Sequence, residues 1–148
     1  MARVVCLDSG PLGLAVHSRN QMEFADWLSR LGDAGILVAV PEIADYEVRR
    51  ELLRLGATSS VARLNALRGA SPYEPITTGI MHRAAELWAE SRRKGLPRAD
   101  RHALDGDSVL AATVESIARR GHEVTLATSN ARHFAGIVPA LPWQEILP

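Results

Sequence analysis

The sequence predicts an α/β fold in which an open, mostly parallel sheet carries helices on both faces. Two observations predict this fold. Short apolar segments alternate along the chain with longer amphipathic segments, and the first apolar segment, residues 4–7, has no alternating charged or polar positions. A strand without such alternation is buried on both faces, as the strands of a parallel sheet are.

The first half of the chain is predicted to form two strands and three helices. Phe24, Trp27 and Leu31 recur at helical spacing, and Gly32 ends their helix. Pro41 follows the second apolar segment and is favoured in the first turn of a helix. The predicted order is strand 3–7, turn 10–13, helix 20–31, strand 36–40, helix 41–55 and helix 60–68.

The second half of the chain is predicted to continue this alternation. Thr78 can cap a long helix, which Gly95 and Pro97 end. The predicted order is strand 75–77, helix 78–92, a loop rich in Asp and Arg, helix 107–120, strand 123–128 and an edge strand at 142–147. No repeat or low-complexity tract interrupts the chain, so residues 1–148 are expected to form a single domain.

The composition is typical of a soluble globular protein, with 47% hydrophobic and 23% charged residues. The single cysteine, Cys6, cannot form an internal disulfide and is expected to be a buried small hydrophobe. No segment has the apolar region of a signal peptide or the roughly 20 apolar residues of a membrane span. We therefore expect a cytoplasmic protein without a membrane partner. The formal net charge is zero, yet the arginines are clustered, which is typical of phosphate-binding surfaces or of solvated helix faces.

Four acidic or amide residues stand just past predicted strand ends or on the helices that follow, namely Asp8, Glu47, Asp107 and Asn130. In a parallel sheet such positions converge on one edge, because ligands bind at the carboxyl ends of the strands. A group of carboxylates there indicates a hard divalent cation, and with it phosphate-ester chemistry.

Each of these residues also has a purely structural interpretation. Asp8 begins an Asp-Ser-Gly-Pro sequence that is typical of an Asx turn. Asp107 precedes an apolar helical segment and can be its N-cap. Glu47 can pair with Arg50 on one helix face. Asp105 is most simply a loop residue, although it could share a cation or its water shell with Asp107.

Other kinds of site find less support in the sequence. The five histidines show no zinc-ligand spacing, and there is no glycine-rich phosphate loop and no Ser-His-Asp set. Trp27 and Trp88 fall on apolar helix stripes and are expected in the core. Arg132 and His133 could approach a phosphate, but packing or capping roles explain them equally well.

The chain resembles PIN-domain nucleases, most closely the VapC-type toxin ribonucleases, at four sequence motifs in the right order. The motifs are LDSG at 7–10, PEIADYE at 41–47, DSVLAAT at 107–113 and ATSNARHF at 127–134. The resemblance implies a PIN-like three-layer α/β/α sandwich with a central, mostly parallel sheet. It implies that Asp8, Glu47 and Asp107 are catalytic and bind one or two Mg²⁺ or Mn²⁺ ions. Asp105 and Asn130 are weaker or water-mediated metal ligands in this interpretation.

The function expected from these motifs is a metal-dependent endoribonuclease that hydrolyses RNA phosphodiester bonds, as the toxin of a type II toxin–antitoxin pair. The resemblance also implies a cognate antitoxin and a homodimer. The alternative is a catalytically weakened module that binds RNA or protein, because Asn130 stands where many members of the family have Asp. A third possibility is a metal-dependent phosphatase acting on small phosphate esters.

Overall fold

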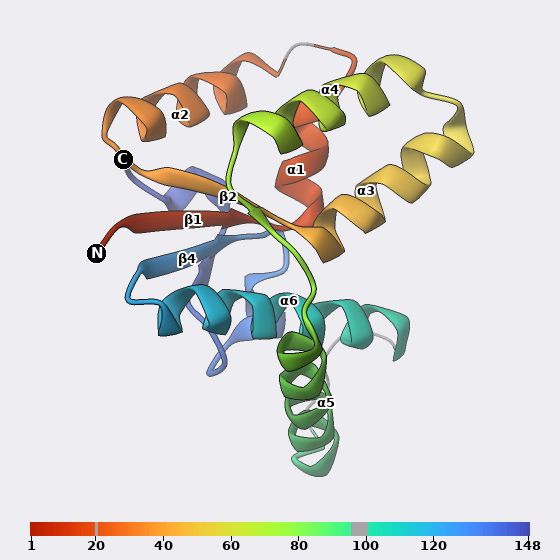
Figure 1. Ribbon diagram of the computed structural model, residues 1–148, viewed down its shortest axis with the longest axis vertical. Coiled ribbons are helices and arrows are strands. Elements are labelled where there is room, and N and C mark those ends of the chain that lie inside the picture. Colours follow the sequence, from red (N-terminus) through yellow and green to blue (C-terminus); the bar gives the residue numbers. More distant parts are fainter. Residues whose placement is uncertain (20, 96–100) are drawn as a thin grey trace.

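The computed structural model describes residues 1–19, 21–95 and 101–148, the side chains of 101–104 excepted (Figure 1). The elements follow in the order β1 (Arg3–Leu7), α1 (Ser9–Val16), α2 (Met22–Asp33), β2 (Leu37–Pro41), α3 (Glu42–Leu55), α4 (Thr58–Ala70), β3 (Tyr73–Glu74), α5 (Thr78–Arg93), α6 (Arg101–Arg119), β4 (Glu123–Ala127), the 3-10 helix η1 (Ala131–Phe134), β5 (Ala140–Leu141) and the 3-10 helix η2 (Trp143–Glu145).

The strands form one five-stranded sheet in the order β3-β2-β1-β4-β5. Strand β1 lies at its centre, where Val5 is paired with Val38 of β2 and with Thr125 of β4. All four strand pairs are parallel. The carboxyl ends of β1, β2 and β4 therefore meet at the same edge of the sheet.

The prediction of a PIN-like three-layer sandwich with a mostly parallel sheet is wrong as stated, because the described strands form an all-parallel sheet in an α/β fold. The chain returns from β4 to β5 through residues 128–139, which include η1, and not through a tight hairpin. A crossover of that length delivers the next strand in parallel orientation. The edge strands are also displaced, since β3 precedes the predicted range 75–77 and β5 precedes the predicted range 142–147.

Alternating side chains of β1 enter two separate hydrophobic cores. Val5 and Leu7 pack in one core, with residues of α1, α2, α3 and α4. Val4 and Cys6 pack in the other, with residues of α5 and α6. Successive strand residues point to opposite faces, so both faces of an apolar strand need a cover of helices, which Figure 1 shows on either side of the sheet. Cys6 is fully buried, as expected.

Helix α1 occupies residues that were predicted as a turn at 10–13. It begins directly after Asp8, its N-cap, and Pro11 falls in its first turn, where a missing N–H is tolerated. Leu12 and Val16 are buried, and this burial favours the helix in spite of its glycines. Gly10 has a packing role, because an added Cβ would lie 3.2 Å from Oγ of Ser129.

Helix α6 begins at Arg101, well before the predicted start at 107, so Asp105 and Asp107 lie inside a helix. The predicted loop assignment of Asp105 and the N-cap assignment of Asp107 are therefore wrong. Thr77, rather than Thr78, caps α5 and accepts a hydrogen bond from the backbone N of Ile80 at 3.1 Å.

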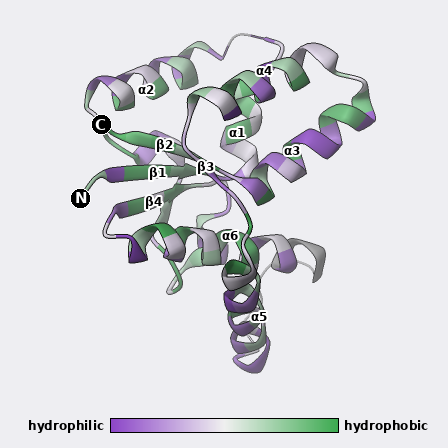
Figure 2. Cartoon of the chain, viewed as in Figure 1, coloured by the Kyte–Doolittle hydropathy of each residue, from purple (hydrophilic) through white to green (hydrophobic). Residues whose placement is uncertain are grey.

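The C-terminal segment is attached to α2 by an aromatic group of Phe24, Trp27 and Trp143, whose ring centroids lie 5.2–5.4 Å apart. Nε1 of the buried Trp27 donates to the carbonyl oxygen of Ile146 at 2.8 Å. Hydropathy follows the packing, with apolar strands and a largely hydrophilic α5 (Figure 2). Among the described residues, no helix combines the length and apolarity that a membrane crossing requires.

Candidate functional site

Asp8 lies at the carboxyl end of β1 and is held there from two sides. Asp8 is 7% exposed and directly follows Leu7, which is paired with Ala127 of β4. Oδ1 accepts a hydrogen bond from the backbone N of Ser9 at 2.7 Å, and Oδ2 accepts one from Oγ1 of Thr128 at 2.6 Å. Asp8 is thus the N-cap of helix α1, where the sequence had indicated an Asx turn. This role leaves further lone pairs on both oxygens for a ligand.

Glu47 reaches from α3 toward the second turn of α6. A Cβ added to Gly106 would lie 3.4 Å from Oε2 of Glu47, so this carboxylate lies directly beside the glycine, at van der Waals distance from such a Cβ. Burial raises the pKa of Glu47, the negative charges of Asp8 and Asp107 raise it further, and Arg50 lowers it. Glu47 therefore lies near enough to both other predicted site residues for their charges to raise its pKa. Within the described part of the chain, it forms no salt bridge with Arg50.

Asp107 projects from α6 and is 21% exposed. Its Oδ2 lies 3.1 Å from Nδ1 of His133, which belongs to η1. The two residues line a cavity of about 10 Å³ together with Leu87, Ser108 and Phe134 among others. The contact joins α6 to the segment after β4 at the sheet edge where Asp8 lies. His133 therefore gives the carboxylate of Asp107 a fixed neighbour.

Asn130 and Asp105 are both exposed, whereas Asp8 is buried and Glu47 and Asp107 are half-buried. Asn130 is the N-cap residue of η1 but makes no side-chain cap hydrogen bond. Its backbone N donates to Oγ1 of Thr128 at 3.0 Å, and the same hydroxyl donates to Asp8. Thr128 therefore connects the fourth motif to the first.

Sequence reasoning missed the hydrogen bond from Thr128 to Asp8, and it did not single out the contact of His133 with Asp107. Thr128 is 1% exposed and directly follows β4, the strand paired with β1. A hydroxyl at the end of a strand beside the strand of Asp8 is the signal that could have identified it. His133 could not be assigned in the same way, because its partner Asp107 lies on a separate helix, 26 positions away.

The chemistry of these donors fits a hard divalent cation, because carboxylate oxygens are the preferred ligands of Mg²⁺ and Mn²⁺. The like charges around Glu47 are what a bound cation would neutralise. The side chains are not arranged as a finished coordination shell, since no group of three His, Cys, Asp or Glu in the described residues has metal-binding geometry. The metal-binding and catalytic roles of Asp8, Glu47 and Asp107 stay predictions.

No protein-family model and no curated protein matches the sequence. Solved structures do match over nearly the whole chain. VapBC2 from Rickettsia felis, bound to a promoter DNA fragment, is similar with a TM-score of 0.73 and 17% identity, covering 95% of this chain and 98% of that one. DNA-bound VapBC from Salmonella typhimurium gives a TM-score of 0.70 and 16% identity, covering 97% of this chain and 99% of that one. FitAcB from Neisseria gonorrhoeae gives a TM-score of 0.66 and 17% identity, covering 96% of this chain and 99% of that one. At these identities the likeness shows the fold alone, which this chain shares with a chain of each complex.

Proposed function

We propose that the protein is a metal-dependent endoribonuclease that hydrolyses RNA phosphodiester bonds. The observation that carries the proposal is the position of Glu47, whose Oε2 would lie 3.4 Å from a Cβ at Gly106, the residue before Asp107. The charges of Asp8 and Asp107 both raise the pKa of Glu47, and the three acids come from the end of β1, from α3 and from α6. Three acids from separate elements are costly to hold together without a cation, so their proximity favours a binding role over a structural one.

In this proposal Asp8, Glu47 and Asp107 hold Mg²⁺ or Mn²⁺ directly or through water. When bound, the cation lowers the pKa of a bound water and neutralises charge that develops on the phosphoryl group. Ser9 and Thr128 fix the position of Asp8 through their hydrogen bonds. His133 orients Asp107, and the exposed amide of Asn130 can accept a hydrogen bond from water without adding charge.

We propose further that the protein is the toxin of a type II toxin–antitoxin pair of VapC type. The four motifs and the shared fold with chains of VapBC and FitAcB structures support this assignment. Of the two members of such a pair, the nuclease is the one that needs an acidic group of this kind. A cognate antitoxin, a homodimer and an RNA substrate belong to the same proposal.

A second candidate function is a binding module that has lost catalysis. Two observations favour it: Asn130 stands at the fourth position without charge, and the described residues hold no preformed trio of metal ligands. Such a module would bind RNA or a protein partner and would leave RNA intact with any divalent ion.

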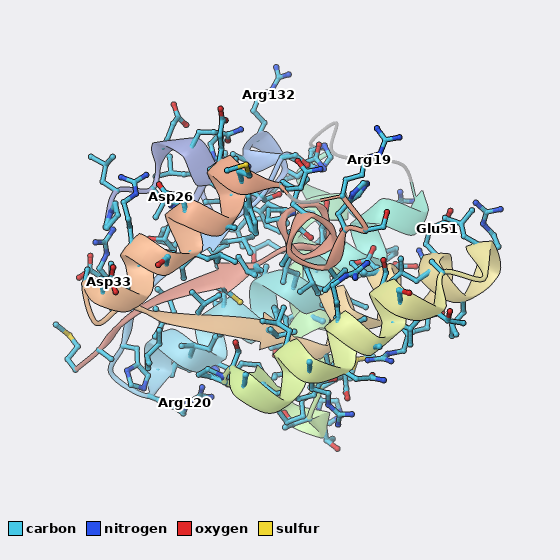
Figure 3. The ribbon with its side chains drawn as sticks, turned by 90° about the horizontal axis from the view of Figure 1, so that it is seen from above. Arg19, Asp26, Asp33, Glu51, Arg120 and Arg132 are labelled. Carbon is cyan, nitrogen blue, oxygen red and sulfur yellow. The ribbon has the colours of Figure 1, made fainter. Side chains whose placement is uncertain are left out.

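The test is cleavage of single-stranded RNA by the purified protein with Mn²⁺, Mg²⁺ or EDTA. Asp8→Asn and Asp107→Asn should abolish metal-dependent cleavage, since each removes ligand charge while keeping shape. Asp33→Asn is the matched control, because Asp33 ends α2 on the surface away from the carboxyl ends of the strands (Figure 3). Wild-type cleavage by Asp107→Asn would overturn the metal mechanism. Turnover of a phosphate monoester without RNA cleavage would indicate a phosphatase.

A further inference from the structure

An aromatic ring and a guanidinium lie together on the outward face of α3. The side chain of Tyr46 is 56% exposed. The Cζ atom of Arg50 lies 5.0 Å from the centroid of its ring, which is a cation–π geometry. Burial does not explain this pair, because the core side of the helix is formed by Ala44, Asp45 and Val48. Arg50 covers one face of the ring, and the exposure of Tyr46 leaves ring surface open to a ligand.

The pair continues outward from the acidic site. With about 100° of rotation per helical residue, Arg50 stands about 60° around α3 from Glu47, and Tyr46 stands about 40° beyond Arg50. Glu47, Arg50 and Tyr46 therefore follow one another across the helix surface. The positive charge of Arg50 acts on the carboxylate of Glu47, in agreement with this order.

Arg50 differs from the other arginines of α3 in its partners. Arg49 pairs with the buried Asp45 at 3.0 Å, and Arg54 pairs with Glu51. Arg50, in contrast, forms no ion pair with any residue that the structure describes. Its cationic charge is thus available for an external anion, one helical turn from a residue of the acidic site.

We propose that Tyr46 and Arg50 form a subsite for one nucleotide of single-stranded RNA next to the bond that is cut. The base stacks on the open surface of the tyrosine ring, and Arg50 binds the adjoining phosphate. Splayed bases of single-stranded RNA stack on aromatic side chains and on guanidinium planes, and arginine binds phosphate with two parallel hydrogen bonds. This inference rests on the proposed ribonuclease function and extends it to the recognition of substrate.

The charge pattern explains why RNA needs such a subsite here. Asp8, Glu47 and Asp107 repel a polyanion, and a metal ion offsets only the charge at its own position. Arg50, which has no ion-pair partner among the described residues, offers a compensating cation beside Glu47 for the next phosphate along the strand. Stacking adds affinity that does not depend on the base, because every base has a π-face.

The experiment measures binding of a fluorescent single-stranded RNA by anisotropy at low salt in EDTA, so that cleavage does not contribute. Tyr46→Ala should weaken binding about tenfold, whereas Tyr46→Phe should restore it because the ring is kept. Arg50→Ala should weaken binding. It should also reduce the slope of log K against log salt by about one, because one phosphate contact is lost. The matched control is Leu53→Ala, because Leu53 lies on the same outward face and is 62% exposed; its binding should equal that of the wild type. Circular dichroism melting checks that the variants are folded.

The other outcomes distinguish an RNA subsite from a protein interface and from the proposed nuclease function. Unchanged RNA binding by Tyr46→Ala, or no saturable binding by the wild type at low salt, overturns the subsite. If Tyr46→Ala binds RNA as the wild type does but binds the proposed cognate antitoxin more weakly, the subsite is also overturned. Tyr46 and Arg50 then belong to a protein interface. RNA binding that depends on Tyr46, in a wild type that cleaves no RNA with Mg²⁺ or Mn²⁺, supports the subsite and refutes the proposed nuclease function.

Discussion

Nδ1 of His133 lies 3.1 Å from Oδ2 of Asp107, and this contact joins η1 to α6 at the edge of the sheet where Asp8 is fixed. A carboxylate that is to bind a metal needs a second contact to hold its orientation. In the proposed nuclease, His133 would therefore be a positioning residue that acts through Asp107.

His133→Ala should raise the Mn²⁺ concentration for half-maximal RNA cleavage by about tenfold or more, because loss of such an outer contact typically costs about 10- to 100-fold in metal affinity or activity. His133→Asn should recover part of the loss, since its amide N can occupy the place of Nδ1. Metal titrations of cleavage separate this effect from a loss of folded protein. The control is His82→Ala, at an exposed position of α5. A His133→Ala curve identical to that of the wild type would refute the positioning role.

Glu47→Gln should raise the thermal unfolding midpoint at pH 7 while it abolishes cleavage. The pKa of Glu47 is raised in the folded protein above its ordinary value of 4.5, first by burial and then by Asp8. A carboxyl group with a raised folded pKa contributes stability that is present below its unfolded pKa and is lost as the pH rises through the folded pKa. The gain from Glu47→Gln should therefore be present at pH 7 and vanish near pH 4.

Glu51→Gln supplies the opposite sign on the same helix. The hydrogen bond from Arg54 lowers the pKa of Glu51, so the charged form is the favoured one. This substitution should give no gain in unfolding midpoint at pH 7, and solvent screening should keep any loss small. A gain in Glu51→Gln equal to that in Glu47→Gln would show that the effect is one of net charge and not of the site.

Gly106→Ala should increase the stability of the protein and decrease its activity. Replacing glycine by alanine inside a helix adds about 0.5–1 kcal/mol to the free energy of unfolding. The new methyl group would lie 3.4 Å from Oε2 of Glu47, where it limits the positions of that carboxylate. Urea unfolding and RNA cleavage measured on one preparation test both parts. Full activity in a stabilised variant would show that Glu47 does not need the space that Gly106 leaves.

The order of strands and helices could be predicted because buried parallel strands have continuous apolar sequences, such as 4–7. Helix α1 could not, because Gly10, Pro11 and Gly13 indicate a turn and only the burial of neighbouring side chains reverses that preference. The parallel direction of β5 depends on a crossover whose path no local pattern specifies. The candidate acids Asp8, Glu47 and Asp107 could be selected because they stand in sequence motifs, and their roles stay predictions. Their supports could not, since Thr128 and Asp8 are 120 positions apart and meet only when β4 pairs with β1.

The last prediction concerns Asn130, the exposed residue at which the sequence departs from the more acidic pattern. Its backbone N is bound to the same Thr128 hydroxyl that donates to Asp8, so a carboxylate at this position would stand beside the acidic site. Asn130→Asp should lower the Mg²⁺ or Mn²⁺ concentration for half-maximal cleavage, because an added anion attracts a dication even after screening. Asn130→Ala should do less harm than Asp8→Asn, since the amide offers at most a carbonyl contact or a water bridge. Metal titrations of the three variants compare them directly. A loss in Asn130→Ala as large as that in Asp8→Asn would make Asn130 a primary catalytic residue, and the ranking of the site residues proposed above would then be wrong.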